Sequence, residues 1–583
     1  MKTETNRWNK IDSQAAEKTV FRLQKRIFVA SKANDNVKVH KLQRRLLKSP
    51  HAKYIAVRQV TQINDGRKTA GPDGLKNPND KEKMELLYAL SISNQPSPAR
   101  THRYPKPGKT GHRELTIFNL IDRCQQALIA LALSPQWEPR FDRRIYALRK
   151  GRRQHDAIAY IKLCLKQPKW VLSADITKFF DNVDTNKLLN TLDATTSIKL
   201  AIKQLINIIR KDSCEATTRE YGIPQGGALS PLLANIVTND LFKQIEKNHY
   251  THHKGSKQPC VVIYADDIIV MSEDQTTLST AQQCVESYLS DWRLSLNPDK
   301  TGVTHTQKTK ASQEAGFNFL GFHIQHHSSD RLKPGGQRGI FLRVSPAMKS
   351  TKRLREECKT IIDECKLIRK RKTQRKHREL RKGKDDITVM IEKLNSKLRG
   401  FATYYKFCNA KTTFSSLDNY LFERLFKWST QRFNRKNRDW IYQNTFSGLE
   451  HDKHGKPLLK KDGTPRQRKW IFKSPFIKNT EEHTTLSKLG DQPIHRYHLV
   501  QGSKSWYDGD WLYWSRRKAN ADYPGIPITI AKAPLLRKQK RCHHCGALLR
   551  SKERLECVSI GAKTHLVHKA CQKPKLIPSK PST

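Results

Sequence analysis

Apolar residues recur at helical spacing near the start of the chain and predict two amphipathic helices within the first 65 residues. One group is Val20, Leu23 and Ile27, and the same spacing of three and four returns at positions 39, 42 and 46. Positions three and four apart lie on one face of an α-helix. Both helices carry Leu-Gln followed by two basic residues, at 23–26 and 42–45. The apolar faces are expected to pack in a bundle, and a Gly/Pro-rich turn at 69–74 ends the segment.

Short apolar runs between residues 100 and 325 predict strands. One run covers 170–174, and two more, at 260–264 and 268–271, are separated by only three residues. This spacing predicts a β-hairpin whose turn is Ala265-Asp266-Asp267. Helical patterns lie between the strands, around 123–134, 154–166, 229–247 and 276–292. This part of the chain is therefore expected to be a mixed α/β domain.

From about residue 345 the pattern becomes helical and basic. Residues 366–384 contain eleven Lys/Arg and a single acid, Glu379. Such a run is either a solvated surface or disordered. From about 430 on, aromatic residues alternate with basic ones, at Trp428, Phe433, Trp440, Tyr442, Trp470, Phe472, Trp506, Trp511, Tyr513 and Trp514. Unpaired bases stack on such rings while phosphates meet the charge, but a core position explains some of the rings equally well.

The net positive charge of the chain limits the classes of molecule that it is expected to bind. Lys and Arg number 110 against 54 acids, a formal charge of +56 over 583 residues. Charge of this size is explained by a polyanion, because phosphates release condensed counterions when cations replace them. The basic helical faces are accordingly expected to contact RNA. A protein that only binds nucleic acid explains the charge as well as an enzyme does.

Hydropathy and cysteine usage indicate the kind of cellular compartment in which the protein is expected to act. No stretch approaches eighteen consecutive apolar residues, so no membrane span is expected, and the polar start at 1–10 does not resemble a secretory signal. Eight cysteines are scattered singly, whereas Cys542, Cys545, Cys557 and Cys571 cluster near the end. This distribution favours a reducing compartment and one metal site in the tail.

Three carboxylates at the predicted strand ends carry the candidate chemistry. Asp266 and Asp267 are adjacent between two apolar strands, and Asp175 directly follows the strand at 170–174. Neighbouring buried carboxylates repel each other unless a cation compensates them. Mg²⁺ prefers oxygen ligands, and two ions about 4 Å apart serve phosphoryl transfer in other enzymes. The sequence therefore predicts a site for two Mg²⁺ ions, which Mn²⁺ can replace.

The motifs around these carboxylates resemble those of group II intron-encoded reverse transcriptase/maturases. Tyr264-Ala265-Asp266-Asp267 is similar to their YADD signature. Further blocks appear in the family's order, at 102–109 with Arg113, 174–182, 222–236, 294–301 and 317–322. Residues 398–405 resemble the maturase (domain X) motif, with Phe401 where the family usually has Trp, and 507–514 resembles a later maturase segment. Five or six ordered blocks do not arise by coincidence.

The resemblance implies a role for each matching residue. Asp175, Asp266 and Asp267 would be catalytic and would bind Mg²⁺ together with the backbone carbonyl of Ile176. Lys106 and Arg113 would contact the triphosphate of an incoming dNTP, where cations offset developing charge.

The remaining implied residues surround the nucleotide. Phe180 would be the steric gate that excludes a ribose 2′-hydroxyl, and Gln225 would lie near the sugar and base. Gly226 would allow close backbone approach. Lys300 would support the metal-binding carboxylates.

Three departures from the family pattern stand out. Tyr146-Ala147-Leu148-Arg149 keeps the arginine of the family's Gly-Phe-Arg block but has no glycine, and Glu114-Leu115 replaces Pro-Leu after Arg113. The C-terminal tail resembles a degenerate H-N-H endonuclease. Cys542 and Cys545 form a CxxC followed by glycine, Cys571 supplies a third ligand, and Cys557 or His568 a fourth. We therefore expect these residues to hold one structural Zn²⁺. No histidine occurs in 546–564 and no Asn after Ala521, so we expect no endonuclease activity.

The sequence thus predicts a right-hand polymerase with α/β (α+β) fingers and palm, an all-α thumb, and a small zinc-knuckle-like module. The expected parts are a basic helical RNA-binding extension (1–85), fingers and palm (86–340), thumb/maturase (345–480) and a basic DNA-binding tail (481–583). The resemblance implies binding, splicing and copying of a group II intron RNA, with dNTPs and target DNA as partners. The expected location is the bacterial cytoplasm or an organelle that encodes the intron.

Two alternatives compete with this interpretation. The first is an RNA-binding splicing factor with a relict polymerase fold, which the intact carboxylates, Phe180, Gln225 and Lys300 argue against. The second is a retron or other cellular reverse transcriptase, which should not carry the block at 398–405. No oligomeric state follows from the sequence.

Overall fold

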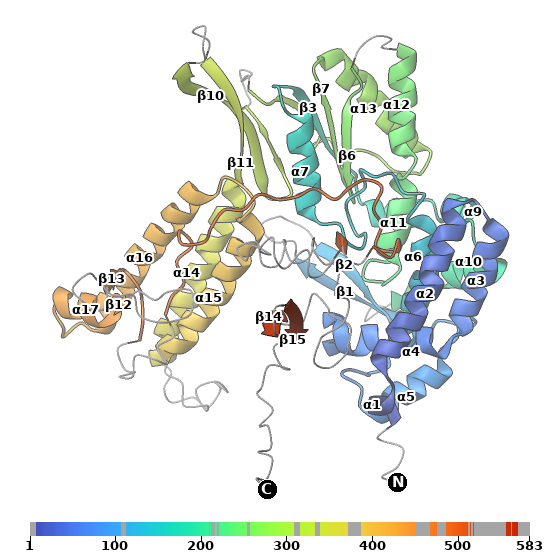
Figure 1. Cartoon of the computed structure of the whole chain (residues 1–583), viewed down its shortest axis with the longest axis horizontal. Helices are drawn as coiled ribbons and strands as arrows, with labels where there is room; N and C mark the ends of the chain where they lie inside the picture. The colour runs from blue at the N-terminus through green and yellow to red at the C-terminus, as the bar shows by residue number, and fades with distance from the viewer. Residues whose placement is uncertain are drawn as a thin grey trace. The chain divides into compact units, whose positions relative to one another are not determined.

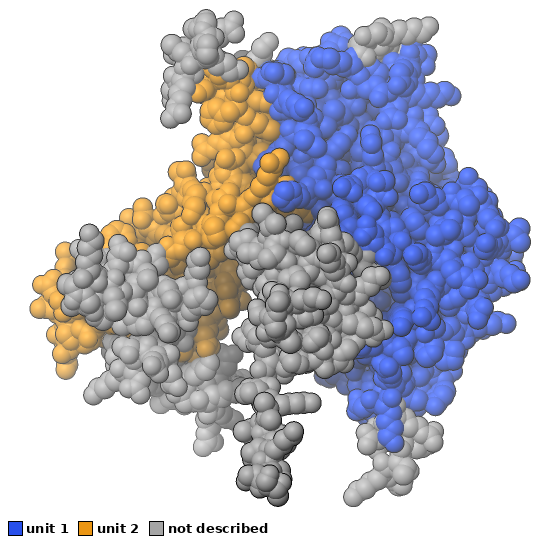
Figure 2. All heavy atoms as spheres, in the orientation of Figure 1, with its two compact units in different colours: residues 1–305, 498–522, 528–583 blue, residues 306–497, 523–527 orange. Residues whose placement is uncertain are grey.

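The computed structural model divides into two compact units (Figures 1 and 2). Unit 1 contains residues 1–305, 498–522 and 528–583, and unit 2 contains 306–497 and 523–527. The structure describes residues 7–105, 112–208, 210–211, 216–217, 221–252, 257–307, 315–332, 338–370, 386–449, 467–474, 485–510, 513–514, 517, 555–560 and 563–568. The compact units therefore do not follow the four parts expected from sequence. The N-terminal helices join the fingers and palm, and a late segment returns to them.

The two predicted N-terminal helices are confirmed as α2 (Ser13–Lys32) and α3 (Asn36–Lys48). Their apolar residues are buried, and the basic residues of both Leu-Gln motifs are exposed. The expectation of only two helices was incomplete, because α4 (Pro50–Arg58) follows at once and begins with a proline at its first turn. Proline fits there because that position needs no helical N–H partner. Helices α1 (Arg7–Lys10) and α5 (Asp80–Ala89) complete this part, with a π turn at Gln59–Ile63 and a 3₁₀ turn at Asp65–Lys68.

The glutamines of the two Leu-Gln motifs bind α6 (Leu120–Trp137). Pro135 lies inside α6 and has no N–H, so the carbonyl of Leu131, four residues earlier, has no helical donor. The side chain of Gln24 donates to that carbonyl at 2.8 Å. Gln43 donates to Gln136 Oε1 at 2.7 Å, also in the buried interior. The repeated glutamines are therefore structural, and only the basic residues beside them face solvent.

Two sheets form the α/β part of unit 1. The first has the order β2-β1-β4-β5, with β1 (Ala99–Pro105) and β2 (His112–Ile117) antiparallel, and short strands β4 (Arg210–Lys211) and β5 (Ala216–Thr217). The second has the order β6-β7-β3-β8. Its strands are β3 (Trp170–Asp175), β6 (Cys260–Tyr264), β7 (Asp267–Ser272) and β8 (Gly302–His305). The predicted hairpin is confirmed as β6–β7.

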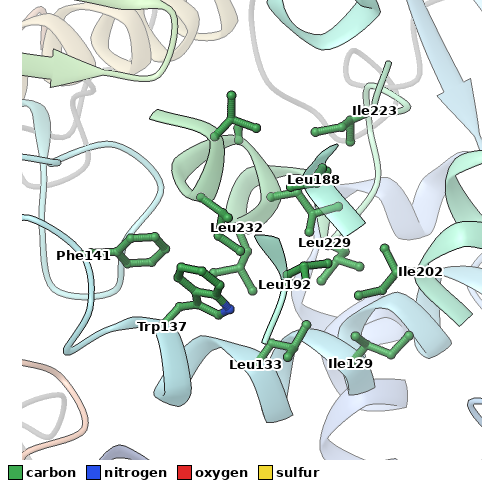
Figure 3. Packing of buried hydrophobic residues seen from close by; sticks show 14 of the residues in the cluster. Ile129, Leu133, Trp137, Phe141, Leu188, Leu192, Ile202, Ile223, Leu229 and Leu232 are labelled. Atoms are coloured by element: carbon green, nitrogen blue, oxygen red, sulfur yellow. The ribbon is translucent and has the colours of Figure 1, made fainter. Parts of the chain in front are cut away.

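Most helices of this part of the chain pack on the second sheet, on α6 or on one another. The helices are α7 (Gln154–Cys164), α8 (Phe179–Asn182), α9 (Thr185–Thr191), α10 (Thr196–Ile206), α11 (Ser230–Thr238), α12 (Leu241–His252) and α13 (Gln275–Ser290). Figure 3 shows side chains of α6, α9, α10 and α11 gathered around Trp137 and Leu192. One apolar cluster runs from Trp8 to Leu294, so the N-terminal helices and the sheet share a core.

Unit 2 begins with a sheet of order β11-β10-β9, made of β9 (Phe317–Phe319), β10 (Phe322–Leu332) and β11 (Arg338–Pro346). Four helices follow, α14 (Met348–Lys370), α15 (Asp386–Tyr405), α16 (Lys411–Arg432) and α17 (Arg438–Thr445). The expected all-α thumb needs a correction, because β12 (Ser447–Leu449) pairs with β13 (Gln467–Lys469). Trp428 and Phe472 are buried, so these rings are core residues rather than base-stacking surfaces.

Most of the tail lies outside the described residues. Cys542, Cys545 and Cys571 are among those positions, as is most of the basic run at 366–384. Cys557 and His568 lie on a two-stranded hairpin of β14 (Leu555–Ile560) and β15 (Lys563–His568). Among the described helices, none is both long and apolar enough to cross a membrane.

Candidate functional site

Two of the three predicted carboxylates lie side by side at the end of the central strands. Asp175, the last residue of β3, is the register partner of Asp267, the first residue of β7. Tyr264 also pairs with Asp267, so the hairpin turn contains only Ala265 and Asp266. Ala265 adopts a positive φ of 57°, which lets two residues reverse the chain. The tight turn thus places Asp266 next to the Asp175–Asp267 pair.

Backbone hydrogen bonds fix the positions of these residues. The N–H of Ile176 donates to the carbonyl of Asp266 at 3.0 Å, which ties the end of β3 to the turn. The N–H of Asn297 donates to the carbonyl of Asp175 at 2.7 Å, and Ile176 forms a bridge with Leu296. The carboxylates are therefore held by neighbouring backbone on both sides of β3 rather than on a free loop.

Burial and like charge disfavour ionisation of Asp267. Its pKa is raised to about 7, first by burial and then by the carboxylates of Asp266 and Asp175. Lys300 acts in the opposite direction, and its ammonium donates to Asp175 Oδ2. Two carboxylates in register and a third in the adjacent turn are a ligand set suited to hard cations. Among the described residues no group of three acidic, His or Cys side chains lies close enough together to hold a metal ion. Lys300 is the cation that pairs with Asp175.

Removing the charge of Asp267 is expected to stabilise the protein when no divalent cation is present. A carboxyl with a raised folded-state pKa carries no penalty below its unfolded pKa of about 4. The penalty grows between about pH 4 and pH 7 and is complete above the folded-state pKa of about 7. Asp267→Asn should therefore raise the melting temperature by about a few degrees at pH 8 in EDTA, and by less at pH 5. Added Mg²⁺ should raise the melting temperature of the wild type more than that of the variant. A lower melting temperature for Asp267→Asn at pH 8 in EDTA would contradict this account.

The predicted gate residue is bonded to the glycine-rich block that follows it in sequence. The carbonyl of Phe180 accepts from the N–H of Ile223 at 2.6 Å, and the N–H of Gly222 donates to Val183 at 2.9 Å. Gly222 has a φ of 91°, and a Cβ there would lie 2.4 Å from the carbonyl oxygen of Asp181. Only glycine allows the two segments to approach this closely. The Phe180 ring is half-buried and packs edge-on against Phe179, with centroids 5.3 Å apart.

The same block reaches the first sheet through Gln225 and Gly226. The N–H of Thr116 in β2 donates to the carbonyl of Gln225 at 2.8 Å. Gly226 has a φ of 104°, and a Cβ there would meet the carbonyl of Thr116 at 2.9 Å. Arg113 lies on β2, three residues before Thr116, but its side chain is outside the described part. Lys106 also lies outside the described residues, so the structure does not test these two nucleotide contacts.

The two departures near the site have structural explanations. Leu148 occupies the left-handed region with a φ of 58° and is exposed, although glycine would suit that conformation better. Arg149 is buried, and its guanidinium pairs with Glu138 at 2.9 Å and donates to the carbonyl of Ile145 at 3.0 Å. Glu114 pairs with Arg103 across β1 and β2 at 3.0 Å. The retained arginine therefore holds the loop, and the extra carboxylate is neutralised by an arginine.

The comparisons with protein families match three consecutive parts of the chain. Residues 8–90 match the N-terminal domain of reverse transcriptase, and residues 104–324 match the reverse transcriptase (RNA-dependent DNA polymerase) family. Residues 370–446 match the maturase-specific domain of group II introns. The three carboxylates and the block at 222–227 all fall within the second match.

Relatives among curated proteins come from bacteria, yeasts and Euglena gracilis. Protein YkfC of Escherichia coli is 27% identical over 52% of this chain, and this chain spans 88% of it. The group II intron-encoded protein LtrA of Lactococcus lactis is 28% identical over 39% of this chain and 38% of its own length. An uncharacterized 91 kDa protein in the cob intron of Schizosaccharomyces pombe is 24% identical over 52% of this chain and 43% of its own. This chain thus spans less than half of the two intron-related proteins.

Proposed function

We propose that this chain, which belongs to the reverse transcriptases that carry a group II intron maturase-specific domain, copies intron RNA into DNA with Asp175, Asp266 and Asp267 as its catalytic residues. The observation that carries the proposal is the meeting of Asp175 and Asp267 in register, with Asp266 in the adjoining two-residue turn. This arrangement lies inside the matched reverse transcriptase domain. It supplies the oxygen ligands that a two-metal polymerase needs.

The residues of the chain have distinct tasks in this mechanism. The three carboxylates, with the carbonyl of Ile176, would hold two Mg²⁺ or Mn²⁺ ions, which activate a primer 3′-hydroxyl and stabilise the leaving pyrophosphate. Lys300 pairs with Asp175 and offsets part of the like charge of the three carboxylates, since it lowers the pKa of Asp267 against the effects of burial and neighbouring acids. Gln225 and Gly226 shape the nucleotide side of the site, bonded to β2.

Two cations complete the nucleotide site in our proposal. Lys106 and Arg113 bind the triphosphate of the dNTP, because cations stabilise charge that develops on the phosphates. Support for Arg113 comes from its place on β2, three residues before the contact between Thr116 and Gln225. The assignment of Lys106 rests on the family resemblance alone.

The maturase domain supports a second task, the binding of a group II intron RNA during splicing. Exposed basic residues of α2 and α3 provide further cations for phosphates, since their apolar and glutamine faces are buried. Target DNA is the proposed partner of the basic tail. A 3′ end of that DNA would prime the copying of the intron. The protein would act where its intron is transcribed, in a bacterial cytoplasm or an organelle.

One experiment separates this proposal from an RNA-binding factor with a relict polymerase fold. Incorporation of dNTPs by the purified chain on an RNA template with a DNA primer is expected, and it should depend on Mg²⁺ or Mn²⁺. An inactive chain that still binds the intron RNA tightly would support the relict alternative instead.

RNA binding is expected to weaken steeply with salt. If about eight phosphates are neutralised, the logarithm of the binding constant should fall with log salt at a slope near −6, at roughly −0.7 per phosphate of a single strand. Neutral substitutions in the basic run at 366–384 should reduce the slope, whereas the same number of substitutions at exposed serines and threonines should not. Filter binding between 50 and 500 mM KCl, about the useful range, measures the slope. A salt-independent binding constant would exclude RNA phosphates as the explanation of the +56 charge.

We also propose that the tail binds one structural zinc ion and does not cleave DNA. The ligands would be Cys542, Cys545 and Cys571, with Cys557 or His568 as the fourth, and a closed tetrahedral site has no position for a catalytic water. Metal analysis of the purified chain should give about one zinc per molecule, and Cys542→Ser should remove it. Mg²⁺-dependent cleavage of an intron-target duplex that is lost in His565→Ala would contradict this proposal.

A further inference from the structure

The segment 498–517 follows residues 306–497 of unit 2 in sequence but belongs to unit 1. A buried ion pair joins it to the rest of that unit. Arg517 donates to both carboxylate oxygens of Asp156 in α7, at 2.5 and 2.6 Å. The Asp156 side chain is fully buried, and it also accepts from the N–H of Val500 at 2.9 Å. Arg517 further donates to the carbonyl of His498 at 2.7 Å. One carboxylate thus anchors both ends of the segment.

Between its two ends the segment folds into a compact turn that buries two aromatic rings. Tyr507 and Trp514 are 2% and 3% exposed. The carboxylate of Asp508 accepts from the N–H of Asp510, and the indole N–H of Trp514 donates to the carbonyl of Ser505. These contacts explain why the Tyr-Asp-Gly-Asp…Tyr-Trp pattern occurs here. Its aspartates close the turn, and its rings fill the space between the turn and unit 1.

Trp514 packs directly on the loop that precedes α7. A Cβ on Gly151, whose φ is 79°, would lie 2.4 Å from the Trp514 ring, so the glycine leaves space for the indole. Arg517 also reaches the carbonyl of Gly151, at 3.4 Å. The segment therefore fixes the loop 145–153 from one side.

The other end of the same loop contacts the strand that leads to the catalytic turn. Ile145 forms a parallel bridge with Ile263, and the N–H of Tyr146 approaches the Ile263 carbonyl at 3.5 Å. Asn235 of α11 donates to the carbonyl of Ala147 at 2.9 Å. Ile263 immediately precedes Tyr264-Ala265-Asp266-Asp267. The loop thus lies between the packed Trp514 and the strand that carries the catalytic hairpin.

We infer that segment 498–517 is a positioning element of the polymerase site, in which Arg517 and Trp514 hold loop 145–153 against β6 and so fix the place of Asp266 and Asp267. The inference rests on the proposed polymerase function. It gives the Tyr-Asp-Gly-Asp…Tyr-Trp pattern at 507–514 a role other than contact with nucleic acid. Displacement of a catalytic group by about 1 Å can reduce a rate by as much as a hundredfold, so loss of these contacts should be visible in turnover.

The test uses the full-length chain and two substitutions, Trp514→Ala and Arg517→Met. Single-nucleotide addition of dTTP to an oligo(dT) primer on poly(rA) gives kcat and KM per active molecule, with active sites titrated by burst amplitude. Both variants should lower kcat at least about tenfold with little change in KM for dTTP, and should need more Mg²⁺ for half-maximal rate. Trp514→Phe should recover much of the rate. Gln501→Ala, an exposed side chain of the same segment, is the matched control and should match the wild type.

The outcomes separate positioning from mere stabilisation. If the variants melt at lower temperature but retain wild-type kcat and Mg²⁺ dependence per active molecule, the segment only stabilises unit 1 and the inference is wrong. If Arg517→Met or Trp514→Ala does not fold, Arg517→Lys and Trp514→Leu supply the same comparison, and wild-type kcat in both also overturns the inference. A wild-type chain that does not extend the primer refutes the proposed function itself, which is a different result.

Discussion

Asp266→Ala is expected to reduce primer extension by at least about a thousandfold, because in the proposed mechanism it removes a metal ligand that no other side chain of the turn can replace. Asp266 occupies a two-residue turn whose other member is Ala265, and its carbonyl is already bonded to Ile176. The fold should survive the substitution, since those bonds come from the backbone. Extension of a DNA primer on an RNA template, at saturating Mg²⁺, measures the loss.

The control for this substitution is Asp291→Ala, which removes a carboxylate from the surface of unit 1. The Asp291 side chain is 70% exposed and lies at the end of α13, outside the triad. It should leave extension unchanged. Intron RNA binding should be the same in wild type, Asp266→Ala and Asp291→Ala, because the basic surfaces remain. Normal cDNA synthesis by Asp266→Ala would remove the carboxylate from the mechanism, and lost RNA binding would show that the two functions are not separable.

Phe180→Val is expected to raise incorporation of rNTPs relative to dNTPs by about tenfold or more, a change of at least ~1.4 kcal/mol in discrimination. The backbone of Phe180 is held by its bond to Ile223, so the substitution should shorten the side chain without moving α8. Use of dNTPs should partly persist, because the carboxylates are not altered. The ratio of kcat/KM values for a dNTP and the matching rNTP is the measurement.

Phe179→Val is the matched control for the loss of an aromatic ring. Phe179 is 3% exposed and belongs to the core, whereas Phe180 is half-buried beside it. Phe179→Val should lower the melting temperature, as large-to-small core substitutions do, without changing sugar selection. If both substitutions leave the ratio unchanged, the gate is not at Phe180. If only Phe179→Val relaxes sugar selection, the gate is Phe179 rather than Phe180.

The central part of the fold could be predicted from sequence because it depends on local patterns. The hairpin 260–271 follows from two apolar runs and a short polar turn, and α2 and α3 follow from helical spacing. The position of Asp175 at a strand end suggested that it joins Asp266 and Asp267, but the local pattern did not give its exact partner. The register of Asp175 with Asp267 depends on the pairing of β3 with β7, which are far apart in sequence.

Other features could not be predicted because they depend on partners distant in sequence. Nothing near Gln24 in the sequence shows that its side chain donates to the Leu131 carbonyl, which lacks a helical donor because of Pro135. Both residues lie more than a hundred positions later. Arg149 matches the arginine of the family block, but only its pairing with Glu138 shows what the side chain does. Trp514 was equally suited to base stacking or to a core, and only the space left by Gly151 decides between them.

The return of 498–517 to unit 1 has a consequence for the order in which the chain matures during synthesis. A ribosome extends a chain at roughly 5–20 residues per second, and domains form as their segments emerge. Residues 306–497 of unit 2 are translated before Arg517 exists, so the ion-pair partner of the buried Asp156 carboxylate is made after them. The main part of unit 2 can therefore form while unit 1 still lacks segment 498–517. Under the proposed function, residues 370–446, which match the maturase-specific domain, would be available to intron RNA before the contacts that hold loop 145–153 have formed.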